Sequence, residues 1–176
     1  MTATALIMGA SASAAEPALI DKPAFTPTNG QYDIDALEAL GRVSAPAVSP
    51  DGKKILYGVS YESVEQNKSN LDLYVMNIDG SGVTRITATP ESESGYAWID
   101  GGRKIAFMNP VDGKMQLWVM NADGSDRKAV SSVENGIQGF LFSPDEKRVV
   151  MIGTVKYSRE AKDIYPDLPD ATGRVI

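Results

Sequence analysis

Short apolar runs alternate with polar turn segments along most of the chain after residue 41. Each run has five to nine residues and is rich in Val, Ile, Tyr, Phe or Trp, which favour a pleated, half-buried strand. The runs are KKILYGVSY, LDLYVMNI, GYAWI, RKIAFMN, MQLWVMNA, GFLFS and KRVVMIGTV. The pattern therefore predicts an all-β architecture built from short strands.

The segments between these runs carry turn sequences, namely SPDGK, DGSG, DGGRK, DGK, DGSD and SPDEK. Asp-Gly is a typical hairpin sequence, because a type I′ turn needs positive φ at both central residues, which Asp tolerates and Gly favours. In the run LYVMN, Leu73 and Val75 share one face of the strand, and Tyr74 and Met76 share the other. Both faces are apolar, so we expect this strand to lie between two neighbouring layers.

A ten-residue segment occurs twice. Residues 73–82 read LYVMNIDGSG, and 44 positions later residues 117–126 read LWVMNADGSD, with seven of the ten positions identical. The acids of the preceding turns, Asp51, Asp100 and Asp145, are 49 and 45 positions apart. Four short strands repeating about every 45 residues are the signature of a β-propeller blade.

The repeat predicts an incomplete propeller of about two and a half four-stranded blades over residues 42–176. The expected blades are 42–89 and 94–132, with a partial blade at 136–176. The first unit also carries an insertion, SYESVEQNKSN, between its second and third strands. Propellers close with about four to eight blades. We therefore expect these residues to be the N-terminal part of a longer protein.

Three segments precede the repeats. Residues 1–15 end in an A-x-A pattern and resemble the end of a secretory signal peptide, although no Lys or Arg precedes Lys22. Residues 16–32 read as an extended linker. A short amphipathic helix is expected over 33–41, with Asp33 as its N-cap, Gly41 at its end, and Ile34, Leu37 and Leu40 at helical spacing. The leader predicts an exported protein, periplasmic or secreted.

Composition excludes several classes of function. The chain has no Cys and no His, which rules out disulfides, thiolate or His-ligated zinc, and a Ser-His-Asp triad within these residues. The net charge of -6 and the absence of a basic stripe argue against a nucleic-acid partner. No stretch reaches the roughly 18 apolar residues of a membrane span.

The repeated turns are candidates for a calcium loop. Asn77, Asp79 and Ser81 offer oxygens at alternate positions, but the Gly falls at the fourth position and Ala88 stands where a bidentate Glu is needed. Local hydrogen bonds within an Asp-Gly turn are the favoured interpretation. Trp98 and Trp118 are expected in the blade core, with a carbohydrate or peptide platform as the alternative. We predict no catalytic, cofactor-binding or metal-binding residue in this chain, and no cofactor.

The sequence resembles the TolB-type propeller repeat on SPDGKKI, LYVMNIDGSGVTRIT and LWVMNADGSDRKAV. The same repeat forms the N-terminal propellers of prolyl-oligopeptidase-family serine peptidases. Two further segments are similar to the secreted dipeptidyl-peptidase and acylaminoacyl-peptidase members of that family: DIDALEALGRVSAPAVSPDGKKI and YSREAKDIYPDLPDATGRVI.

The resemblance implies an α/β-hydrolase domain beyond Ile176, with its catalytic Ser, Asp and His all outside the present residues. The propeller would then be a non-catalytic lid that admits short peptides, with the hydrolase domain as its partner. The alternative is a TolB-like periplasmic propeller that binds proteins without catalysis. A third possibility is a propeller enzyme whose central metal is ringed by acids such as Asp100.

Overall fold

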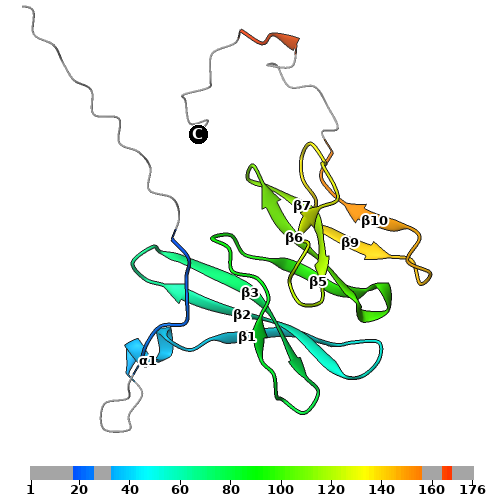
Figure 1. The fold of residues 1–176 in the computed structure, drawn as a ribbon. Coiled ribbons are helices and arrows are strands. Elements are labelled where there is room, and N and C mark those ends of the chain that lie inside the picture. Colours follow the sequence, from blue (N-terminus) through cyan, green and yellow to red (C-terminus); the bar gives the residue numbers. More distant parts are fainter. Residues whose placement is uncertain (1–17, 26–32, 156–163, 168–176) are drawn as a thin grey trace, which may run out of the picture.

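Three antiparallel sheets follow one another along the chain in the computed structural model, which describes residues 18–25, 33–155 and 164–167 (Figure 1). In each sheet the strands are ordered as in the sequence. The first sheet contains β1 (Arg42–Val48), β2 (Lys54–Ser63), β3 (Lys68–Asn77) and β4 (Thr84–Arg85). The second contains β5 (Ser94–Ile99), β6 (Lys104–Val111), β7 (Lys114–Asn121) and β8 (Lys128–Ala129). The third contains β9 (Gly139–Phe142) and β10 (Val149–Ile152).

The predicted all-β class, with propeller-type sheets and one short helix before them, is confirmed. The helix, α1, spans Ile34–Glu38, and a single 3-10 turn, η1, spans Asp100–Gly102. Asp33 caps α1 as predicted, since its carboxylate accepts a hydrogen bond from the Ala36 amide at 2.9 Å. The predicted signal segment 1–15 and most of the predicted linker 16–32 lie outside the described residues.

The two copies of the ten-residue segment occupy equivalent places in successive blades. Each copy forms the end of the third strand of its sheet and the turn that follows. The pairing registers match, because Lys54 pairs with Asn77 in the first sheet as Lys104 pairs with Asn121 in the second. The 44-residue repeat is therefore a repeat of whole four-stranded blades.

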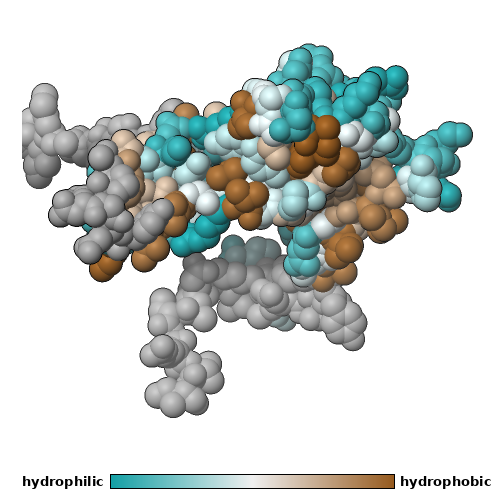
Figure 2. Space-filling model, turned by 90° about the horizontal axis from the view of Figure 1, so that it is seen from below, coloured by the Kyte–Doolittle hydropathy of each residue, from teal (hydrophilic) through white to brown (hydrophobic). Residues whose placement is uncertain are grey.

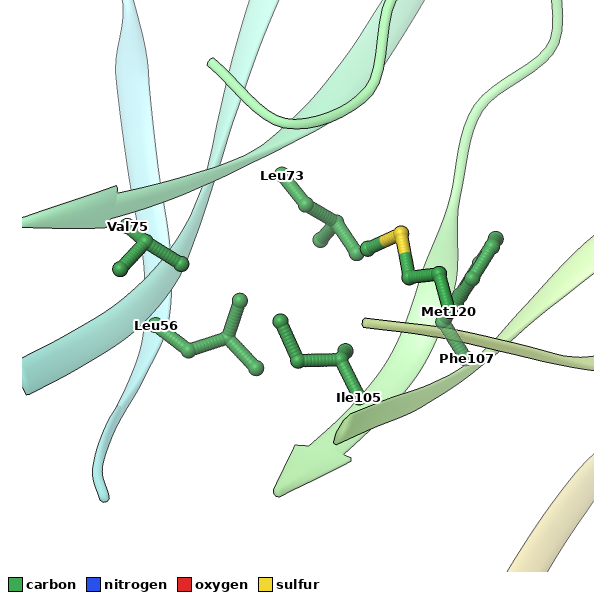
Figure 3. Packing of buried hydrophobic residues seen from close by; sticks show 6 residues of the cluster. All are labelled: Leu56, Leu73, Val75, Ile105, Phe107 and Met120. Atoms are coloured by element: carbon green, nitrogen blue, oxygen red, sulfur yellow. The ribbon is translucent and has the colours of Figure 1, made fainter. Parts of the chain in front are cut away.

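Alternation along the strands gives each blade two apolar faces, as predicted. The cluster between the first and second blades joins side chains of both (Figure 3): Leu56, Leu73, Val75, Ile105, Phe107 and Met120. The opposite face of the second blade packs on the third sheet through Ala106, Met108, Leu117 and Ile137. The second blade is thus packed between two layers.

Both residues have the predicted positive φ at two of the Asp-Gly pairs, Asp100-Gly101 and Asp112-Gly113. Asp112 and Gly113 have φ of 50° and 74°, as a two-residue type I′ turn between β6 and β7 requires. In the repeated turns Gly80 and Gly124 have positive φ but Asp79 and Asp123 do not, so the type I′ expectation is wrong there. Those turns close with the Gly amide bonded to the Asn carbonyl three residues earlier, which leaves the Asp in an ordinary conformation.

The insertion in the first blade forms strand rather than loop. Ser60 to Ser63 pair with Leu71 to Lys68, so β2 and β3 extend across it and only Val64 to Asn67 remain as a turn. These ten-residue strands are two residues longer than β6 and β7. Asn67 of the insertion therefore lies exposed at the tip of a long hairpin.

Candidate functional site

The oxygen atoms of the repeated turns are used within the turns themselves. Asp79 accepts hydrogen bonds from the amide of Ser81 at 2.9 Å and from its hydroxyl at 2.7 Å. Asp123 and Ser125 repeat both bonds at the same distances. The Ser hydroxyl lowers the pKa of each Asp, which keeps the carboxylate ionised as an acceptor. This geometry supports the interpretation as structural turns.

The acids of the preceding turns are not all equivalent, although their spacing suggested it. Asp51 and Asp145 each accept a hydroxyl from the Ser two residues earlier, Ser49 and Ser143, at 2.6 Å. Asp100 instead forms ion pairs with Arg103 and Lys104, and Arg103 lowers the pKa of its carboxyl. Because Ile99 stands where the other blades have Ser, the side-chain bond that builds the turn is missing and the acid is shifted by one position.

Both tryptophans lie in the core, which confirms the interpretation favoured from the sequence. Trp98 and Trp118 pack against the cluster between the first and second blades. The indole of Trp98 donates to the Ala47 carbonyl at 2.9 Å, and that of Trp118 donates to the Asn109 carbonyl at 2.9 Å. Both side chains are half-buried, and their indole nitrogens are hydrogen-bonded inside the fold.

A buried polar network at the junction of the first two blades is the feature that sequence reasoning missed. Its centre is Glu93, which is 1% exposed and precedes β5. Its carboxylate accepts hydrogen bonds from the hydroxyls of Thr87 at 2.8 Å and Thr89 at 2.9 Å, and from the amide of Asn109 at 3.1 Å. The guanidinium of Arg127, in the second blade, forms an ion pair with the same carboxylate at 3.2 Å.

A second buried acid extends this network toward the N-terminal segment. Asp72, on β3, pairs with Arg85 at 2.7 Å, and the Thr87 hydroxyl lies 3.3 Å from its other oxygen. Arg85 also pairs with Asp21 at 2.5 Å. Charged and hydroxyl groups thus run continuously from the segment 18–25 through the first blade to Arg127.

The surroundings of Glu93 and Asp72 act on the pKa of each carboxyl in opposite directions. Burial raises the pKa of both Glu93 and Asp72, while their hydrogen bonds and the nearby arginines act in the opposite direction. The guanidinium of Arg127 lies 5.2 Å from the ring centres of Phe107 and Trp118, so it also makes cation–π contacts with the core. The network ties blade to blade, and its acids are enclosed rather than presented to a ligand.

An open groove of about 410 Å³ lies between the segment 18–25, α1 and the tip of the long hairpin. Its lining includes five carboxylates and no basic side chain: Asp21, Asp35, Glu38, Glu62 and Glu65. Two of these acids are already paired, Asp21 with Arg85 and Glu62 with Arg42. The groove is therefore strongly acidic.

The sequence model of the family described as "TolB beta propeller domain" matches residues 31–165. The chain belongs to the TolB β-propeller family. This TolB-type propeller is 47% identical over 163 residues to Dipeptidyl-peptidase 5 of Porphyromonas gingivalis, a match that covers 90% of the chain and 24% of that relative. It is 37% identical over 142 residues to Dipeptidyl-peptidase 5 of Porphyromonas endodontalis, covering 81% of the chain and 20% of that protein.

Among solved structures, the acylaminoacyl peptidase of Pyrococcus horikoshii matches with a TM-score of 0.59 at 20% identity. The match covers 74% of this chain and 20% of that one, and it concerns the fold. The TolB-type propeller therefore spans about a quarter or less of the length of these peptidases. Both Porphyromonas relatives are named as dipeptidyl-peptidases.

Within this TolB-type propeller, the described residues hold no cluster of three acids in an arrangement that could bind a metal ion. Asp100, the acid considered for a central metal, is paired with two basic side chains. No helix in the described part of the chain is long and apolar enough to cross a membrane.

Proposed function

We propose that this chain is the non-catalytic propeller portion of an exported serine exopeptidase that cleaves short peptides. The observation that carries the proposal is the 47% identity over 163 residues to Dipeptidyl-peptidase 5 of P. gingivalis, of which the chain spans only 24%. The absence of His throughout the sequence is consistent with a triad located elsewhere in a longer polypeptide. The signal-like residues 1–15 support export.

In this proposal the propeller acts on substrate access rather than on bond cleavage. A hydrolase domain in the same polypeptide would supply the nucleophilic Ser, its His base and the Asp that orients the His. The blades would cover that site and limit entry to short peptides. The interblade network around Glu93 and the core around Phe107 serve this role by holding neighbouring blades together, since a filter needs walls of fixed shape.

The test uses the complete gene product. We expect a fluorophosphonate probe to label one serine outside residues 1–176, and release of dipeptides from short peptides to be lost together with that label. The 176-residue chain alone should neither bind the probe nor cleave peptides. A well-folded complete protein that stays unlabelled would rule out the serine-peptidase proposal.

A protein-binding TolB-like scaffold is the second candidate, favoured by the match of the family model to residues 31–165. It predicts that the gene encodes propeller blades only, with no G-x-S-x-G sequence followed by Asp and His. Reading the gene downstream of Ile176 and repeating the probe experiment separate the two candidates.

A further inference from the structure

Two acids are buried at the junction of the first two blades. Hydrophilic residues cover much of the surface seen from below (Figure 2), but within the described part of the chain Glu93 is 1% exposed and Asp72 is 2% exposed. A carboxyl group enclosed in this way needs hydrogen-bond partners from the protein, because its oxygens have left water. The protons available around the two acids therefore decide their charge.

The hydroxyl of Thr87, a residue that is 3% exposed, lies between the two acids. Its oxygen is 2.8 Å from Oε2 of Glu93 and 3.3 Å from Oδ1 of Asp72, and it accepts a hydrogen bond from the Leu73 amide at 2.8 Å. A hydroxyl donates one hydrogen bond and accepts two. If both acids are ionised, two carboxylates compete for the single proton of Thr87. A proton on Oε2 of Glu93 removes this conflict, because Glu93 then donates to Thr87 and Thr87 donates to Asp72.

The other oxygen of Glu93, Oε1, is supplied with donors by the second blade. It lies 3.1 Å from the side-chain amide nitrogen of Asn109 and 3.2 Å from the guanidinium of Arg127. The Thr89 hydroxyl is 2.9 Å from the same oxygen and 2.7 Å from the Glu91 carbonyl, so its one proton also has two acceptors. Oε2 is therefore the oxygen of Glu93 that can take a proton without opposing these donors.

The charges of the network also favour one bound proton. The connected set holds three carboxyls and two guanidiniums: Asp21, Asp72, Glu93, Arg85 and Arg127. One proton makes this set neutral, and an uncompensated charge inside a fold is costly. Burial raises the pKa of both Glu93 and Asp72, which agrees with a retained proton.

The remaining titratable groups beside the network do not alter this balance. Glu91 forms an ion pair of its own with Lys68 at 3.2 Å. Tyr74 lies opposite Arg85 in the sheet, and burial raises the pKa of its hydroxyl above the ordinary value of 10.0, so the ring is neutral.

We propose that Glu93 and Asp72 share one proton through the hydroxyl of Thr87, and that this proton strengthens the contact between the first and second blades. Asp72 lies on β3, and Thr87 and Glu93 lie in the connection between β4 and β5. When the proton is lost at higher pH, two like charges face one hydroxyl and the connection loosens. The junction is thus a pH-sensitive contact. The inference does not depend on the proposed function, because all of these groups belong to the described residues.

Infrared spectroscopy of the complete gene product, labelled with ¹³C at the side-chain carboxyl of glutamate, tests the inference. The C=O band of a protonated carboxyl is separate from the bands of a carboxylate, and subtracting the spectrum of Glu93→Gln isolates the signal of residue 93. At about pH 6, where an ordinary Glu is ionised, we expect a protonated glutamate in the natural protein that is missing from the variant. Glu93→Gln should fold, because a Gln side chain can copy the protonated acid, with its carbonyl toward Arg127 and its amide toward Thr87.

Asp72→Asn tests whether the proton is shared. Without the second carboxylate, Thr87 donates to Glu93 alone, so the pH at which the band disappears should fall by at least about one unit. In a Thr87→Val background, which removes the hydroxyl and keeps the shape of the side chain, the effect of Asp72→Asn should be at most about half as large. Thr87→Ser keeps a hydroxyl and should keep the full effect. Circular dichroism checks that each variant is folded.

The absence of a protonated glutamate from the natural protein at about pH 6 would overturn the proposal. Equal shifts caused by Asp72→Asn in the natural and the Thr87→Val backgrounds would also overturn it, because the two acids would then interact without the hydroxyl. Neither outcome bears on the fluorophosphonate experiment, so the failure of this inference and the failure of the peptidase proposal are distinguishable.

Discussion

Tyr96 of the second blade hydrogen-bonds main-chain groups of the first. A bulge in β1 between Ser44 and Ala47 interrupts the pairing with β2. The Tyr96 hydroxyl donates a hydrogen bond to the Ser44 carbonyl at 2.6 Å and accepts one from the Gly58 amide at 2.8 Å. The indole of Trp98 donates a hydrogen bond to the Ala47 carbonyl. Side chains of one blade thus satisfy backbone groups that a bulge leaves unpaired in another.

We expect Tyr96→Phe to lower the free energy of unfolding by about 1–3 kcal/mol, because it leaves a part-buried amide and a carbonyl without their partner. Urea denaturation followed by tryptophan fluorescence measures the change. Tyr57→Phe is the matched control, since no hydrogen bond of that hydroxyl occurs within the described residues. Equal losses in both variants would contradict the assigned role of the Tyr96 hydroxyl.

The buried acid Glu93 gives stability a characteristic dependence on pH. Burial raises its pKa in the folded state above the ordinary value of 4.5, so its contribution is complete below that value and is lost as pH rises through the folded pKa. The stability of the natural protein relative to Glu93→Gln should therefore fall as the pH rises above 4.5. Urea unfolding of both proteins across this range measures it.

Asp79→Asn is the control, because the effect of this acid on stability should depend on pH with the opposite sign. Ser81 lowers the pKa of Asp79, so the contribution of this acid is lost as pH falls through its folded pKa. If the relative stability against Glu93→Gln rises with pH, the assignment of Glu93 as a burial-destabilised acid is wrong.

At the scale of the elements, most of the fold could be predicted from the sequence repeat, because hydrophobic alternation and the 44-residue spacing are local and periodic. The sequence did not reveal the partners of Glu93 and Asp72, which come from segments brought together only by folding. One signal was present: Asp72 interrupts the run LDLYVMN between two leucines, where an acid is expected only with a buried partner. The type I′ prediction was wrong at the repeated turns, because the length of the loop, rather than the Asp-Gly pair, selects the turn type.

The β-bulges in β1 and β5, the first strands of the two complete blades, can be tested with a matched pair of variants. β1 bulges at Ala45, with φ of 44°, and β5 bulges at Gly95, with φ of 52°. A left-handed Ala costs about 1–2 kcal/mol, partly offset by the flexibility of Gly in the unfolded chain. We expect Ala45→Gly to stabilise the protein by about 0.5–1 kcal/mol.

Gly95→Ala should have the opposite effect. Besides the same backbone cost, its new methyl would lie 2.7 Å from the Met108 side chain. Thermal melting of both variants against the natural protein measures the two shifts. Changes of the same sign would contradict the bulge as the common cause.

At the scale of the whole molecule, burial depends on how many layers surround a blade. Met76 and Met120 occupy the same position of the repeat and lie on the same face of their blades, which in the second blade is the face toward the first. Met120 is 1% exposed because the first blade covers it, whereas Met76 is half-buried. The second blade has packed neighbours on both faces, and it is the most enclosed part of the described structure.

This difference in burial predicts which sheet exchanges its amide hydrogens first. β9 and β10 form a sheet of two four-residue strands, and Leu141, Val150 and Ile152 are 72%, 64% and 59% exposed. Two-stranded sheets are marginally stable on their own in water, whereas β6 and β7 are paired on both edges and packed on both faces. In this chain, amides of 139–152 should therefore exchange with deuterium much faster than those of 104–121, as measured by peptide mass spectrometry. In a longer polypeptide that adds strands to β10, the difference should shrink; equal exchange in the present chain would mean that the third sheet is already supported by other residues.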